Sequence, residues 1–146
     1  MLATETPIRL VLADDDEDDR LMAREALAVS RLTNPLDEVS DGMELLEYLR
    51  GCLERKDPLP GLILLDLNMP RMDGREALAE IKSNPELRRI PIVVLTTSKA
   101  EEDIFRTYDL GVNSFISKPI RFEGLVEIMT QIGQYWFEIV RLPGDE

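Results

Sequence analysis

Residues 61–74 have the sequence Gly-Leu-Ile-Leu-Leu-Asp-Leu-Asn-Met-Pro-Arg-Met-Asp-Gly, in which four apolar residues run without a break into Asp66. An uninterrupted apolar run bounded by glycine and proline is typical of a strand buried on both faces, as in a parallel sheet. In open α/β sheets, ligands bind beyond the carboxyl ends of the strands. Asp66 therefore stands where a functional site is expected.

Strand-like and helix-like segments alternate along the chain. We expect strands over residues 8–13, 35–39, 62–65, 91–95 and 112–117. We expect a helix after each strand, the first following Asp16 and the others over residues 42–56, 74–82, 99–110 and 121–140. This alternation predicts an α/β fold of the (βα)5 type, with a doubly wound five-stranded parallel sheet, right-handed crossovers and an extended last helix.

The first helix is expected to use Asp16 as its N-cap, because an aspartate oxygen accepts hydrogen bonds from first-turn amides. Its apolar residues recur at helical spacing and are Leu21, Met22, Ala26, Leu27 and Val29. In the third helix, the residues expected to face inward are Ala77, Leu78 and Ile81. Both patterns predict helices with one apolar side.

The composition excludes several partners and chemistries. Acidic residues outnumber basic residues by 29 to 17, and the net charge of −12 argues against nucleic acid or an anionic membrane as a partner. A single cysteine cannot form an internal disulfide, and the lack of histidine excludes Ser-His-Asp catalysis and histidine metal sites. The chain has no basic leader and no apolar run of about 18 residues, so we expect neither a signal peptide nor a membrane span. We therefore expect a cytoplasmic protein.

Polar residues follow four of the expected strands and would meet at one edge of the sheet. They are the pair Asp14-Asp15, then Asp66, Thr96 and Lys118. Taken singly, each is explained as well by a solvated loop, a turn residue or a surface lysine. Taken together, they place matching chemistry at the ends of four separate strands, which favours a site.

The chemistry of this set is coherent. Neighbouring carboxylates repel one another unless their pKa values rise or a cation binds between them. Oxygen ligands without histidine or cysteine favour a hard ion such as Mg²⁺. A lysine ammonium and a threonine hydroxyl can hold the oxygens of an incoming phosphoryl group while an aspartate oxygen attacks it.

The chain resembles the receiver domain of two-component response regulators on these residues. The resemblance rests on Asp14-Asp15, on the run from Leu65 to Gly74, and on Thr96 and Lys118-Pro119, which lie 30 and 52 residues after Asp66. It implies a flavodoxin-like receiver fold. We expect a single receiver domain over residues 1–146, with a core at 7–132 and a C-terminal extension at 133–146.

The resemblance also implies roles for individual residues. Asp66 is the expected phosphoacceptor, and the expected Mg²⁺ ligands are Asp14, Asp15, Asp66 and the backbone carbonyl of Asn68. Because Asp16 continues the acidic run, Asp15-Asp16 is the alternative register for the metal-binding pair. An Asp16→Asn variant that loses phosphorylation while Asp15→Asn keeps it would shift the pair by one residue.

Three further residues are expected to respond to the phosphoryl group. Thr96 and Lys118 would contact it, and Phe115 falls where the family has an aromatic residue that turns inward when the threonine moves. The Lys118-Pro119 bond is expected to be cis, which proline adopts at low cost.

The last helix continues beyond what covers a sheet, and its end is rich in aromatic residues. Those expected to form a homodimer interface are Tyr135, Trp136, Phe137, Ile139 and Val140. Packing back onto the same chain is the alternative.

Residues 135–143 and 103–113 are similar to the single-domain regulators paired with bacterial phytochromes. This similarity implies a phytochrome sensor histidine kinase as phosphodonor, and the downstream protein is unknown.

Two other functions are alternatives to the phosphorylation switch. An aspartate-nucleophile phosphatase of the haloacid dehalogenase type needs an acid two residues after its nucleophile, where this chain has Asn68. A degenerate receiver acting as a constitutive scaffold would lack some of the phosphoryl-handling residues. We therefore expect a response regulator that catalyses only its own phosphorylation and autodephosphorylation and is not otherwise an enzyme.

Overall fold

The expected apolar runs form the strands of one parallel sheet. The computed structural model describes residues 8–30, 34–67, 69–96, 111, 114–117 and 121–134. Within these residues the sheet has five strands in the order β2-β1-β3-β4-β5. The strands are β1 (Leu10–Ala13), β2 (Leu36–Val39), β3 (Leu62–Leu65), β4 (Ile92–Thr96) and β5 (Ser114–Ser117). The doubly wound α/β fold is therefore confirmed.

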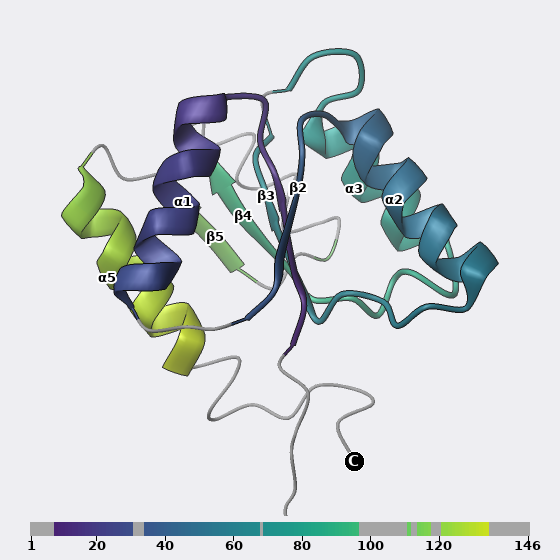
Figure 1. Cartoon of the computed structure of the whole chain (residues 1–146). Helices are drawn as coiled ribbons and strands as arrows, with labels where there is room; N and C mark the ends of the chain where they lie inside the picture. The colour runs from purple at the N-terminus through teal and green to yellow at the C-terminus, as the bar shows by residue number, and fades with distance from the viewer. Residues whose placement is uncertain are drawn as a thin grey trace, which may run out of the picture.

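Helices cover both faces of this sheet. They are α1 (Glu17–Val29), α2 (Gly42–Arg55), α3 (Gly74–Ser83) and α5 (Phe122–Ile132). Figure 1 shows α1 and α5 on one face and α2 and α3 on the other. The helix expected at 99–110 lies outside the described residues. None of the described helices is long and apolar enough to cross a membrane.

Aspartates determine where the first three helices begin. Asp16 accepts hydrogen bonds from the amides of Asp18 and Asp19 at the start of α1, as predicted. Asp41 caps α2 and Asp73 caps α3 in the same way. A side-chain oxygen at the N-cap satisfies amides that have no partner inside the helix.

Side chains alternate between the two faces along the central strands, and they divide the core into two clusters. The α1–α5 cluster takes one set from β1, β3 and β4: Leu10, Leu12, Leu62, Leu64, Val93 and Leu95. The α2–α3 cluster takes the other: Val11, Ala13, Ile63, Leu65, Ile92 and Val94. The four residues of β3 are at most 1% exposed, as expected for a strand covered on both faces.

Helix α1 differs from the predicted apolar stripe. Leu21 and Val29 are 43% and 59% exposed, whereas the buried residues are Ala23, Ala26 and Leu27. The small alanines let α1 lie beside α5, and the two larger side chains fall outside that contact.

At the other end of the chain, α5 ends at Ile132, although the backbone is still helical at Gly133. The helix was expected to reach Val140, and residues 135–140 lie outside the described part of the chain.

Candidate functional site

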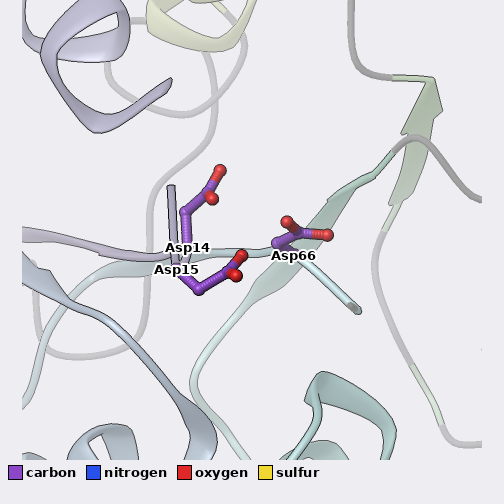
Figure 2. Close-up of side chains that lie close together, drawn as sticks. All are labelled: Asp14, Asp15 and Asp66. Carbon is purple, nitrogen blue, oxygen red and sulfur yellow. The ribbon is translucent and has the colours of Figure 1, made fainter. Parts of the chain in front are cut away.

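Three aspartates meet where β1 and β3 end. Asp14 and Asp15 follow β1, and Asp66 follows β3 on the neighbouring strand. The amide of Asp66 donates a hydrogen bond of 2.9 Å to the carbonyl of Ala13, which fixes the relative position of the two strand ends. Each aspartate offers one carboxylate oxygen, and these three oxygens all lie within 4.8 Å of one another (Figure 2).

Burial makes this group of carboxylates unusual. Asp14 and Asp66 are 2% and 6% exposed, and only Asp15 is open to water. Buried charges of one sign at this separation are costly unless an opposite charge compensates them. The donor set consists of oxygen alone, which fits a hard divalent cation such as Mg²⁺.

The loop between β1 and α1 determines which of the consecutive aspartates join the group. Asp16 points its carboxylate at the first-turn amides of α1, so Asp14 and Asp15 are the ones that approach Asp66. The amide of Asp16 also donates to Asp14 Oδ1 at 3.0 Å. Arg20 Nη1 donates to the backbone carbonyl of Asp14 at 2.7 Å and so ties the loop to α1.

The loop between β3 and α3 turns back tightly after Asp66. The amide of Gly74 donates to the carbonyl of Leu67 at 2.9 Å. A Cβ at Gly74 would collide with the carbonyl oxygen of Asp66 and lie 2.7 Å from Leu67 Cα. Glycine is therefore required for α3 to begin this close to the strand end.

Sequence reasoning missed an ion pair that joins this loop to α2. Asp41 Oδ2 accepts from Arg71 Nη2 at 2.6 Å and from Arg71 Nε at 2.8 Å. Burial raises the pKa of Asp41, but hydrogen bonds from the Glu44 amide and from Arg71, together with the guanidinium charge, outweigh it and leave the pKa below its ordinary value. No pattern in the sequence pairs these residues, which lie 30 positions apart.

Two more of the predicted site residues are placed by their backbone. Thr96 is the last residue of β4, the strand next to β3, and therefore lies at the same sheet edge as Asp66. Phe115 pairs with Val94 in the register of β4 and β5. Asn68, Lys118 and the Lys118-Pro119 bond lie outside the described residues.

Comparison with known proteins agrees with this geometry. Residues 10–130 match the family model of the response regulator receiver domain. The chain belongs to this receiver family. The fold is thus that of a receiver domain of the two-component type.

Individual relatives align with the receiver over nearly their whole length. Response regulator Rcp1 of Synechocystis sp. strain PCC 6803 is 41% identical over 138 residues, with 94% of each chain covered. The probable methanogenesis regulatory protein FilR2 of Methanothrix harundinacea is 37% identical and covers 99% of this chain and 93% of its own.

Solved structures show the same similarity. The phosphorylated cyanobacterial phytochrome response regulator RcpA superposes with a TM-score of 0.86 at 45% identity, over 94% of this chain and 99% of RcpA. The Mn²⁺-bound form of Rcp1 superposes with a TM-score of 0.84 at 40% identity, over 94% of this chain and 99% of Rcp1.

Proposed function

We propose that this receiver is a phosphorylation switch in which Asp66 accepts a phosphoryl group from the phosphohistidine of a sensor histidine kinase. The observation that carries the proposal is the group formed by Asp14, Asp15 and Asp66 at the ends of two adjacent strands. The kinship with RcpA, whose structure was determined in its phosphorylated form, supports it.

In the proposed reaction, a carboxylate oxygen of Asp66 attacks the phosphorus and the bond to the imidazole nitrogen breaks. The products are an acyl phosphate on Asp66 and an unmodified kinase histidine. The hydrogen bond from the Asp66 amide to Ala13 holds the nucleophile at the strand end. Positioning and electrostatics supply most of the rate acceleration in such transfers.

A divalent cation is part of the proposal. Asp14, Asp15 and Asp66, with the backbone carbonyl of Asn68, would hold Mg²⁺, which neutralises negative charge on the phosphoryl oxygens when bound. The Mn²⁺-bound structure of Rcp1 supports a cation site in a close relative.

The remaining site residues would sense the phosphoryl group. We propose that Thr96 and Lys118 contact its oxygens, and that Phe115 changes position when Thr96 moves. Such a change would alter the surface that binds partner proteins, as in other proteins that are switched by phosphorylation. Catalysis by this chain would be confined to its own phosphorylation and dephosphorylation.

We further propose a phytochrome sensor kinase as the phosphodonor, in the cytoplasm. The similarity to RcpA, a phytochrome response regulator, supports this choice. An unidentified protein would receive the signal.

The C-terminal extension is proposed to join two copies of the chain, with a receiver core at 7–132. Helix α5 leads directly toward residues rich in aromatic side chains. We propose that these residues form a homodimer interface: Tyr135, Trp136, Phe137, Ile139 and Val140.

Phosphotransfer tests the central assignment. A phytochrome histidine kinase loaded with labelled phosphate should pass it to the wild type in Mg²⁺ and not to Asp66→Asn. Asp57→Asn is a matched control, because Asp57 is exposed in the loop that precedes β3, away from the site. Asp15→Asn should block transfer, whereas Asp16→Asn should weaken the α1 cap and leave transfer in place. Transfer to Asp66→Asn at the wild-type rate would refute the proposal.

A further inference from the structure

The loop that follows Asp66 is fastened to the N-terminus of α2 at two points. The first is the ion pair between Arg71 and Asp41, with N to O distances of 2.6 and 2.8 Å. The second is a hydrogen bond of 2.8 Å from the amide of Gly42 to the carbonyl of Met72. We call these four residues the latch. It joins two elements whose paired residues Asp41 and Arg71 lie 30 positions apart in the sequence.

Asp41 is a firm anchor for this latch. Asp41 is 4% exposed, and its Oδ1 accepts a hydrogen bond of 2.9 Å from the amide of Glu44, which caps α2. The other oxygen receives the guanidinium fork of Arg71. A two-pronged, charge-assisted contact of this kind constrains direction as well as distance. The position of Arg71 is thereby tied to the start of α2.

The backbone at Arg71 has a conformation that surrounding contacts must support. Arg71 has a φ of 62°, in the left-handed region that residues other than glycine seldom adopt. Such conformations persist where surrounding contacts determine them. A Cβ at Gly42 would collide with the carbonyl oxygen of Met72, so the close approach also depends on glycine. Contacts made by α2 therefore fix the shape of the loop.

The latched loop carries part of the proposed site. It begins at Asp66, and the residues on either side of Asn68, Leu67 and Met69, are buried at 0% and 8% exposure. Both pack in the α2–α3 cluster together with Met72. A change at Arg71 would thus be transmitted along a short segment, in which Leu67 and Met69 are buried, to the carbonyl and carboxylate that are proposed to hold the cation.

We propose that Arg71, acting through Asp41, is a positioning residue that sets the affinity of the receiver for its divalent cation. This inference rests on the proposed function of the site. Residues that orient metal ligands without touching the metal commonly change its affinity by about 10- to 100-fold when altered. The latch would orient the two proposed metal ligands of this loop, which are the carboxylate of Asp66 and the backbone carbonyl of Asn68.

Mn²⁺ binding to the full-length protein, followed by electron paramagnetic resonance of the free ion, measures this effect directly. Arg71→Gly removes the guanidinium while accepting the positive φ, so it isolates the ion pair from backbone strain. Asp41→Ser removes the carboxylate while keeping an N-cap oxygen for α2. We expect each variant to bind Mn²⁺ about tenfold more weakly, and the double variant to bind no more weakly than the worse single variant.

Two further variants sharpen the test. Arg71→Lys keeps the charge without the fork and should restore part of the affinity. Arg55→Ala breaks an exposed pair with Asp57 at the other end of α2 and should bind Mn²⁺ as the wild type does. Phosphorylation of Arg71→Gly by acetyl phosphate should be slow at low Mg²⁺ and approach the wild-type rate at saturating Mg²⁺.

The outcomes separate this inference from the function on which it rests. Wild-type Mn²⁺ affinity in Arg71→Gly, or losses in the double variant that multiply, would overturn the latch even if phosphorylation still depends on Asp66. Phosphorylation of Asp66→Asn at the wild-type rate would overturn the proposed function itself.

Discussion

Replacing Gly74 by alanine should destabilise the protein, whereas the same replacement at Gly51 should stabilise it. A Cβ at residue 74 would collide with the carbonyl oxygen of Asp66 and lie 2.7 Å from Leu67 Cα. Both obstacles are backbone atoms, so relief requires the strand end or α3 to move. At Gly51, inside α2, the nearest atom is Arg55 Nη1 at 2.9 Å, on a side chain that is 62% exposed and able to rotate away.

The magnitudes follow from these surroundings. Alanine gains up to about 1 kcal/mol over glycine inside a helix, and this is the expected gain at Gly51. Overpacking against rigid neighbours costs about 1–3 kcal/mol, and we expect Gly74→Ala to lower the free energy of unfolding by about 2 kcal/mol, the middle of this range. For a domain of this size, 1 kcal/mol corresponds to about 4 °C in Tm. Gly74→Ala should therefore melt roughly 8 °C lower and Gly51→Ala roughly 4 °C higher.

Urea denaturation followed by far-ultraviolet circular dichroism gives the two free energies of unfolding, and Mn²⁺ binding gives a second measurement. Gly74→Ala should also bind the ion more weakly, because the carbonyl that must move belongs to Asp66. The reasoning is refuted if Gly74→Ala is as stable as the wild type, or if both variants gain stability.

Two other predictions concern acid stability and assembly. The pKa of Asp41 is depressed in the folded state, so its contribution to stability is present above about pH 4 and is lost as the pH falls. The free energy of unfolding of Asp41→Ser should be about 1.5–3 kcal/mol lower than that of the wild type at pH 7. A difference of the same size at pH 3 would contradict this prediction. Trp136→Ala should be monomeric by light scattering at concentrations where the wild type is dimeric, whereas Val29→Ala, at an exposed apolar position on α1, should remain dimeric.

The positions of the central strands β1, β3 and β4 were predictable because these strands are buried on both faces. The run at Leu62–Leu65 has no polar residue to break it, and it is much shorter than a typical helix. Helix starts were predictable where Asp16 and Asp41 act as N-caps, since that chemistry is local. Capping by Asp16 also leaves Asp14 and Asp15 beside Asp66, which favours the predicted register of the acidic pair.

Tertiary contacts account for what the sequence did not reveal. The spacing of apolar residues in α1 could not show that Leu21 and Val29 would be exposed, because that depends on where α5 lies. The pairing of Asp41 with Arg71 was equally hidden, since a helix cap and a distant loop residue meet only after the sheet has ordered the strands.

The division of the core by the sheet has an evolutionary consequence. Among the residues that the structure describes, Leu67 and Met69, which follow Asp66, pack in the α2–α3 cluster, whereas Met129 and Ile132 of α5 pack in the α1–α5 cluster. Substitutions without shared partners have nearly additive effects on stability. Mutations that remodel α5 for a new partner can therefore accumulate without disturbing the loop beside Asp66, so recognition can diversify among descendants while the chemistry is inherited unchanged.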